Sequence, residues 1–263
     1  MIRFGARIVA GASLGALYIR ERRFRVAMER VSAAALETLL NAIDANNAVT
    51  GAHVRRVAEY ALTLAHAADC DEKLERSIER VALFHDIGKI DGGLSDIIND
   101  SKKLTPSDRR AIKTHPDGGA DVLEPLAPFY PDLPEGVVAH HERWDGSGYP
   151  KGLRGTRIPF SARVVSIADT FDAVTHARSY RGAQSVEKGM EIIACGRGTQ
   201  FDPDLVDLFL SPPVMNQIRA AIRKEFAPKR RGPKRRRRGE DDPAPDITFR
   251  WRKQGASPQT ADR

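Results

Sequence analysis

Residues 140–150 read HHERWDGSGYP, so two of the seven histidines in the chain stand side by side before a short polar loop. Gly146 and Gly148 lie within that loop, and glycine adopts a left-handed backbone conformation at little cost. Pro150 ends the loop, and its ring fixes the backbone φ angle where the chain leaves. The stretch therefore predicts a helix end that carries both histidines, followed by a rigid turn.

The sequence on both sides of this stretch has a helical pattern. Apolar residues recur at spacings of three and four positions, the period of an amphipathic helix. Thr105 is a candidate N-cap, with Pro106 at the first helical position. Helices are predicted over 32–46, 53–68, 74–86, 159–177, 185–195 and from Asp202-Pro203 to about 226. No run of alternating strands with hairpin turns occurs, so the predicted fold class is all-α.

Histidine and aspartate side chains on several of these segments form a candidate metal site. Each of them alone is an ordinary surface or core residue. Nitrogen and carboxylate ligands without thiolate suit Fe, Mn, Zn or similar divalent ions. Seven side chains are too many for one ion that keeps positions open for water and substrate, but they suit two ions that share a carboxylate, which is an arrangement for phosphoester hydrolysis. The set is His53, His85, Asp86, His115, His140, His141 and Asp169.

Several motifs follow one another in a fixed order. TGAHVRRV (50–57), HDIGK (85–89) and LTPSDRRAIKTHP (104–116) precede HHERWDGSGYP, while IPFSARVVSIADTFDAVT (158–175) and GTQFDPDLV (198–206) follow it. In this order they resemble the HD-GYP domain family, the bacterial branch of the HD phosphohydrolase superfamily that degrades cyclic di-GMP. The resemblance runs from about Thr50 to Phe209 and implies a helical bundle of the HD type.

The same resemblance implies how the metal ligands are divided. His53, His85, Asp86 and Asp169 would hold one ion, while His115, His140 and His141 would hold a second, with Asp86 bridging. Neighbouring helix positions point about 100° apart, so adjacent histidines flank one ion most easily at a helix end. The expected cofactors are two divalent ions, Fe or Mn.

Substrate contacts follow from the resemblance as well. Lys89 lies four residues after His85, one helical turn on, and resembles the lysine that steadies the scissile phosphate. Lys89 and Asp86 are thus the expected catalytic residues. A purely structural role for Tyr149 is an equal alternative to substrate contact. The expected substrate-binding residues are Lys89, Arg143, Tyr149, Arg178 and Arg181.

Four more residues near the motifs have secondary expectations. Asp172 and Glu142 are carboxylates that could hold the metal-binding histidines in place. His66 and His176 match no motif and are expected to be structural or exposed.

Two positions depart from the family. Some members carry a glutamate four residues before the first histidine, where it recruits a third metal, but this chain has Val49. An isopropyl group cannot ligate a cation, so two ions are predicted rather than three. After Lys89 the chain continues IDGGLSDIINDSKK, one residue longer than the family's usual turn, which leaves the nucleotide preference open.

The net charge of +7 comes from the C-terminal tail alone, because 12 basic and 5 acidic residues lie after 227. A tail with this composition is predicted to be disordered and to contact polyanions loosely. The net charge says nothing about the surface of the folded part, so it does not identify that part as a nucleic-acid binder.

The predicted organisation is an N-terminal helical segment (1–48), a phosphohydrolase domain (49–226) and the basic tail (227–263).

Other features concern location and assembly. The apolar run 8–19 is flanked by arginines and is too short to span a bilayer. It is expected to be a helix that packs or associates, and the alternatives are a membrane-surface helix, a signal-peptide-like stretch or the remnant of a membrane segment. A homodimer is a further expectation. Cys70 and Cys195 have no CxxC partner, which is typical of reduced thiols in the cytoplasm.

The expected activity is metal-dependent hydrolysis of cyclic di-GMP to pGpG in bacterial second-messenger signalling, with further cleavage to GMP left open. Two alternatives stay open. One is an HD phosphohydrolase that acts on another cyclic dinucleotide or nucleotide. The other is a receptor that binds cyclic di-GMP without cleaving it, although a receptor of this kind usually lacks at least one metal ligand.

Overall fold

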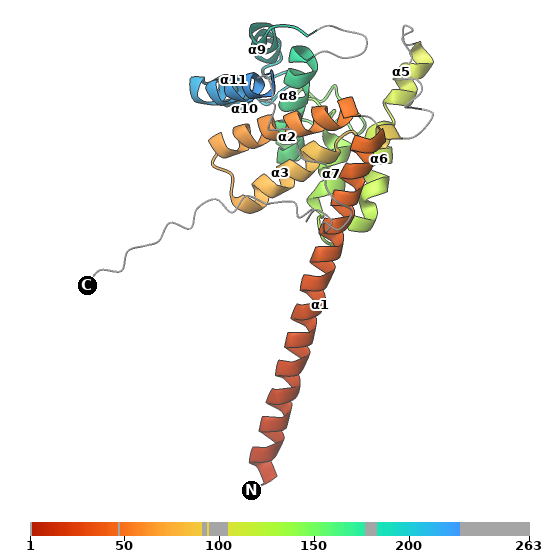
Figure 1. Ribbon diagram of the computed structural model, residues 1–263, viewed down its shortest axis with the longest axis vertical. Helices are drawn as coiled ribbons and strands as arrows, with labels where there is room; N and C mark the ends of the chain where they lie inside the picture. Colours follow the sequence, from red (N-terminus) through yellow and green to blue (C-terminus); the bar gives the residue numbers. More distant parts are fainter. Residues whose placement is uncertain (1, 47, 91–93, 95–104, 177–182, 227–263) are drawn as a thin grey trace, which may run out of the picture. The chain divides into compact units, whose positions relative to one another are not determined.

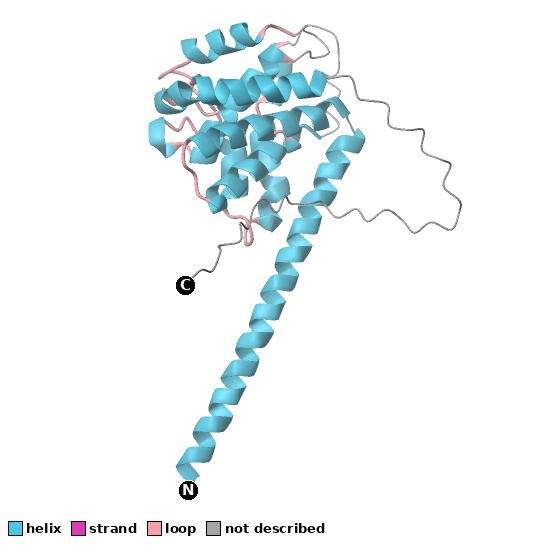
Figure 2. Cartoon of the chain, turned by 60° about the vertical axis from the view of Figure 1, so that its left-hand side comes forward, coloured by secondary structure: helices cyan, strands magenta, loops and turns pink. Residues whose placement is uncertain are grey.

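The computed structural model describes residues 2–46, 48–90, 94, 105–176 and 183–226 (Figure 1). Apart from one isolated bridge between Arg197 and Phe201, these residues form helices and loops only, as predicted (Figure 2). The helices are α1 (Ile2–Asn46), α2 (Ala48–Ala67), α3 (Glu72–Phe84), η1 (Ile87–Ile90), α5 (Pro106–Ile112), α6 (His115–Leu123), η2 (Glu124–Leu126), α7 (Asp132–Ala139), η3 (Gly155–Arg157), α8 (Phe160–Thr175), α9 (Val186–Cys195), α10 (Pro203–Phe209) and α11 (Pro212–Phe226).

The core lies where α2 packs against α3 and α8. Val57 and Leu64 of α2, Val81 of α3 and Ile167 and Phe171 of α8 are all fully buried. The spacing of seven positions in α2 and of four in α8 puts the residues of each helix on one face. This packing brings α3 and α8 beside α2. His53 lies on α2 and Asp169 on α8, while His85 directly follows the last residue of α3.

Local signals fix several helix starts. The Thr105 hydroxyl accepts from the Asp108 N–H at 3.2 Å, and the Asp108 carboxylate accepts from the Thr105 N–H at 2.8 Å. This reciprocal pair is a capping box, so the predicted helix start is confirmed. Ser185 caps α9 in the same position by accepting from the Lys188 N–H at 3.1 Å.

The single helix predicted from Asp202-Pro203 to about 226 is wrong in one respect. Two helices occupy this range, α10 and α11, and they meet at Leu210 and Ser211. Pro212 and Pro213 lack the backbone N–H that a continuing helix needs. A proline pair fits the first turn of a new helix, where those donors have no partner inside the helix.

Helix α1 is longer than the predicted 32–46 segment and joins the core through its last turns. Leu36, Leu40 and Ile43 are buried there. Among the described residues, no helix is both long and apolar enough to cross a membrane. The predictions for the basic tail concern residues outside the described part of the chain. The predicted domain boundaries stay predictions.

Candidate metal centre

Seven polar side chains from different helices meet beside the core. They form two groups, and within each group the ligand atoms lie within 4.8 Å of one another. One group holds Asp86, His115, His140 and His141, and the other holds His53, His85 and Asp169. The structure therefore brings together all seven residues that the sequence analysis selected.

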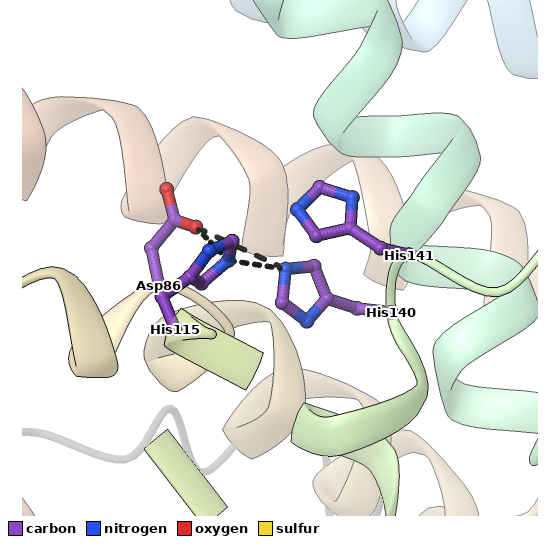
Figure 3. A group of neighbouring side chains, drawn as sticks. All are labelled: Asp86, His115, His140 and His141. Atoms are coloured by element: carbon purple, nitrogen blue, oxygen red, sulfur yellow. Dashed lines mark hydrogen bonds and ion pairs between the residues drawn. The ribbon is translucent and has the colours of Figure 1, made fainter. Parts of the chain in front are cut away.

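The first group gathers around one oxygen of Asp86 (Figure 3). Asp86 Oδ1 lies 3.3 Å from His115 Nε2 and 3.9 Å from His140 Nε2. The two Nε2 atoms are 3.2 Å apart. The His141 ring lies beside His140, with ring centroids 4.0 Å apart.

The second group faces the other oxygen of the same carboxylate. Asp86 Oδ2 lies 3.6 Å from His85 Nε2 and 4.0 Å from His53 Nε2. Asp169 Oδ1 lies 3.3 Å from His53 Nε2 and 3.8 Å from His85 Nε2. Asp86 therefore stands between the groups with one oxygen towards each, which is the position that a bridging ligand needs.

Backbone contacts orient three of the imidazole rings in the same way. The Nδ1 atoms of His85, His115 and His140 lie 2.8, 2.7 and 2.6 Å from carbonyl oxygens three residues earlier in the chain. A carbonyl only accepts, so each Nδ1 carries the proton. In a neutral ring the Nε2 atom then presents a lone pair to the centre, the usual arrangement of a metal-binding histidine.

The donor set fits divalent cations on two observations of this structure. The Nε2 atom of His85 is buried and has no hydrogen-bond partner, which is costly for a polar atom away from water. The Nε2 atom of His53 faces carboxylates, the nearer being Asp169 Oδ1 at 3.3 Å. The Nε2 atoms of His115 and His140 face each other at 3.2 Å, while both Nδ1 atoms contact backbone carbonyls. A positive charge between the rings would satisfy all four atoms.

The protonation states of the candidate ligands also suit metal binding. Burial lowers the pKa of His85 and of His140, and it lowers that of His141 to about 4. These rings are neutral near pH 7. Burial raises the pKa of Asp86, but its neighbours, Lys89 first among them, together outweigh burial, and the net pKa lies well below the usual value. Neutral imidazoles around an ionised carboxylate are the protonation states that metal binding requires.

His53 differs because two carboxylates contact it. Burial lowers its pKa, yet hydrogen bonds with Asp169 and Asp172 outweigh burial and raise it to about 9. Burial raises the pKa of the Asp169 carboxyl, but the hydrogen bond to His53 and the neighbouring charges together lower it below its usual range.

Gly88 brings Asp86 and His115 close together. A Cβ atom on Gly88 would lie 2.1 Å from the His115 carbonyl oxygen and 2.6 Å from the Gly119 nitrogen. Neither backbone atom can move independently, so only glycine lets η1 lie this close to α6. The HDIGK motif contains this glycine, but the requirement for it was missed, because it depends on the backbone of α6.

The paired histidines stand where α7 ends, as predicted. His140 is the residue after the last turn, with φ −67° and ψ −14°. Gly146 has φ +83°, so the expected left-handed turn is present. At Gly148, a Cβ atom would meet the Arg143 nitrogen at 2.3 Å; close approach rather than positive φ requires glycine there. The peptide bond between Tyr149 and Pro150 is cis.

Glu142 has a different role from the one expected. Its carboxylate oxygens accept from the backbone N–H groups of Lys151, at 2.6 Å, and Leu153, at 3.0 Å. It therefore fastens the segment after the cis bond and does not orient a metal-binding histidine.

Asp172, by contrast, contacts a candidate ligand directly. Its Oδ2 lies 2.6 Å from His53 Nδ1, while Arg56 donates to both of its oxygens at 2.6 and 3.0 Å. His176 Nδ1 lies 3.0 Å from Asp172 Oδ1 and is buried. The structural alternative for His176 is thus correct. The link between Arg56 and Asp172 was missed, because 116 residues separate them in the chain.

Lys89 reaches the centre by a different geometry from the one expected. Helix α3 ends at Phe84, and Lys89 belongs to the short 3₁₀ helix η1. The relation to His85 is therefore not one turn of a continuous α-helix. Instead, Lys89 Nζ lies 2.6 Å from Asp86 Oδ1, three residues earlier.

A cavity of about 280 Å³ opens beside both groups. His141 and Asp169 line it, as do the predicted substrate contacts Arg143 and Tyr149. The Tyr149 ring stacks on His141 with centroids 4.9 Å apart and 25° between the ring planes. Arg178 and Arg181 lie outside the described residues.

Comparison with known families agrees with this arrangement. A family model described as an HD domain matches residues 37–205. The chain belongs to the HD domain family, and the resemblance to its HD-GYP members is confirmed.

Two relatives with known names illustrate the relationship. The chain is 37% identical over 174 residues to 3′3′-cGAMP-specific phosphodiesterase 2 of Vibrio cholerae, a match that covers 65% of this chain and 33% of that one. It is 35% identical over 195 residues to the cyclic di-GMP phosphodiesterase response regulator RpfG of Xanthomonas campestris, covering 72% and 51%. The chain thus spans between a third and about half of the length of these relatives.

A solved structure shows the same fold. The crystal structure of a cyclic GMP-AMP specific phosphodiesterase of V. cholerae superposes with a TM-score of 0.53 at 21% identity, over 73% of this chain and 51% of that one. At this identity the likeness concerns the fold alone.

Proposed function

We propose that this protein is a metal-dependent phosphodiesterase that hydrolyses cyclic di-GMP to linear pGpG, in bacterial second-messenger signalling. The observation that carries the proposal is the position of Asp86, with one carboxylate oxygen towards each of two histidine groups. We assign His53, His85, Asp86 and Asp169 to one divalent ion, and His115, His140 and His141, with Asp86, to a second. Iron or manganese suits this mixture of nitrogen and carboxylate ligands.

Two such ions, when bound, supply a hydroxide at neutral pH and neutralise charge on a phosphoryl group. The residues of the chain prepare the site for this chemistry. Backbone carbonyls hold the ring nitrogens of His85, His115 and His140 in one tautomer. Burial of the groups excludes bulk water, which strengthens electrostatic interactions in the site. Lys89, beside Asp86, is the cation that we expect to contact the phosphate undergoing cleavage.

We propose two ions per chain, because Val49 offers no ligand atom four residues before His53. Without a third cation, a second phosphate is neutralised less completely. We therefore expect pGpG, rather than GMP, as the main product.

The comparison with named relatives gives a specific reason to consider a second substrate, 3′3′-cGAMP. One relative is named for 3′3′-cGAMP and another for cyclic di-GMP, at similar identity to this chain. Hydrolysis of 3′3′-cGAMP is therefore the alternative function. A receptor that binds without cleaving is disfavoured because all seven ligand residues are present.

Partner contacts beyond the substrate are proposals from the sequence. They comprise polyanion binding by the basic tail, a homodimer, and peripheral membrane association in the cytoplasm through the N-terminal segment.

The test is incubation of Mn-loaded or Fe-loaded protein with cyclic di-GMP, 3′3′-cGAMP and cyclic di-AMP, followed by chromatography of the products. We expect pGpG from cyclic di-GMP, and no product from the Asp86→Ala variant. If the metal-loaded protein leaves all three dinucleotides intact, the proposed function is wrong.

A further inference from the structure

Lys113 occupies a position at the cavity that neither the metal centre nor the predicted substrate contacts explain. It is the residue directly after α5 and lies two positions before His115. Its side chain is exposed and lines the same cavity as His141, Arg143 and Tyr149. Lys113 therefore brings a positive charge to this cavity from a different part of the chain than Arg143 does.

An aromatic ring links Lys113 to the metal centre. The ammonium nitrogen of Lys113 lies 5.1 Å from the centre of the Tyr149 ring, within the range of a cation–π contact. The same ring stacks on His141, one of the candidate ligands. Tyr149 thereby sets the place of the lysine relative to the metal centre, and the cation stays within the cavity.

Lys89 and Arg143, the two predicted substrate-binding cations that the structure describes, are already paired. Lys89 Nζ lies 2.6 Å from Asp86. Arg143 donates from Nε to Ser147 Oγ at 2.9 Å and lies 3.6 Å from Asp145. Lys113 forms no ion pair with a carboxylate of the described residues. It is thus the cavity cation whose charge is least compensated within that part of the protein.

A cyclic dinucleotide carries two phosphates, and the metal centre engages only the one that is cleaved. The other remains negatively charged and has to be accommodated beside the centre, where the cavity lies. A charge-assisted hydrogen bond from an ammonium group is well suited to this purpose.

We propose that Lys113 binds the phosphate of the cyclic dinucleotide that is not cleaved, so that it selects substrates with two phosphates over simple phosphodiesters. This inference rests on the proposed function and goes beyond it, because it makes Lys113 a specificity-determining residue of the cavity. A purely structural role, in which Lys113 only supports the Tyr149 ring, is the competing explanation.

The test compares substrates with one and with two phosphates. Mn-loaded wild type and the variants Lys113→Gln, Lys113→Arg and Arg110→Gln are assayed on cyclic di-GMP and on bis(p-nitrophenyl) phosphate, which has a single phosphate. Arg110 is the matched control, because it is exposed on the same helix α5 and its replacement removes the same charge. Dissociation constants for cyclic di-GMP are also measured in EDTA, where no turnover occurs.

We expect Lys113→Gln to raise KM for cyclic di-GMP about ten-fold, the effect of losing one charged hydrogen bond. The same variant should hydrolyse bis(p-nitrophenyl) phosphate like the wild type, and its dissociation constant in EDTA should rise in parallel with KM. Lys113→Arg should retain most of the affinity, and Arg110→Gln all of it.

An unchanged KM in Lys113→Gln would overturn the inference, as would an equal loss on both substrates, which would indicate a structural role. A different outcome would contradict the proposed function itself. In that case the wild type itself would cleave bis(p-nitrophenyl) phosphate but none of the cyclic dinucleotides.

Discussion

The Nε2 atoms of His115 and His140 lie 3.2 Å apart, while the Nδ1 atom of each ring donates to a backbone carbonyl. Because Nδ1 is the donor in each ring, Nε2 is left as the atom that each ring directs at the other. The arrangement is unfavourable by itself and becomes favourable with a cation between the rings. This buried arrangement of the two rings is explained if the native protein holds a metal ion between them.

Metal should therefore stabilise the fold. A ligand that binds only the native state at about 100 times its dissociation constant adds about 2.7 kcal/mol. We expect the thermal midpoint of the wild type to fall when EDTA is added and to recover with excess Mn²⁺, as followed by circular dichroism. In His140→Ala the effect of EDTA should be much smaller. Equal midpoints of the wild type with and without metal would argue against the two sites.

Asp86 should matter more for metal content than any ligand of a single group. We expect Asp86→Ala to lose both ions and all hydrolysis while the helical circular dichroism spectrum persists. His141→Ala, which changes only the first group, should retain about one ion, since each histidine belongs to one site. Elemental analysis of the two variants decides the point. Wild-type turnover in Asp86→Ala would rule out a bridging role.

Gly88→Ala should damage the centre without touching a ligand. The added Cβ would lie 2.1 Å from the His115 carbonyl oxygen, so η1 and α6 would have to separate and Asp86 would move away from His115. We expect turnover to fall at least ten-fold through lost positioning. The matched control is Gly118→Ala on α6, where nothing lies within 4 Å of the new atom. That variant should keep full activity and gain up to about 1 kcal/mol of stability.

Asp172→Asn should weaken both the fold and the His53 site. The substitution removes the charge that Arg56 and His53 contact in a buried position, and breaking a buried ion pair costs about 3 kcal/mol. We expect a lower free energy of unfolding in urea and a loss of metal from the His53 group. Glu191→Gln removes an exposed partner of Lys188 and should change stability by less than about 0.5 kcal/mol. Equal free energies of unfolding for Asp172→Asn and Glu191→Gln would contradict the stabilising role that we assign to Asp172.

Removal of residues 228–263 should leave the hydrolysis of cyclic di-GMP unchanged. Every residue assigned to the centre or the cavity lies before this segment. Retention on a heparin column should decrease, because 12 basic residues are lost with it. A large fall in turnover would show that the tail belongs to the catalytic unit.

The sequence predicted the helices well, and the residues that it selected as candidate ligands lie together in the structure, because both leave local signals. Helical periodicity is visible within one segment, and the ordered motifs around His85, His115 and His140 identify the family. The break between α10 and α11 also has a visible signal, the Pro212-Pro213 pair. The apolar pattern on both sides of the pair favoured one continuous helix.

Contacts between distant segments left no such signal. The bonds of Asp172 with His53 and Arg56 join helices more than 100 residues apart. The need for glycine at position 88 depends on the backbone of α6, and the place of Lys113 depends on the Tyr149 ring. These features follow from tertiary packing, which a single sequence does not reveal.

The most direct test of the two-ion centre is an anomalous difference map from a crystal of the Mn-loaded protein. The account predicts two peaks per chain, ~3.5–4 Å apart, with the Asp86 carboxylate between them and one oxygen towards each. A single peak, or two peaks that do not share Asp86, would contradict it.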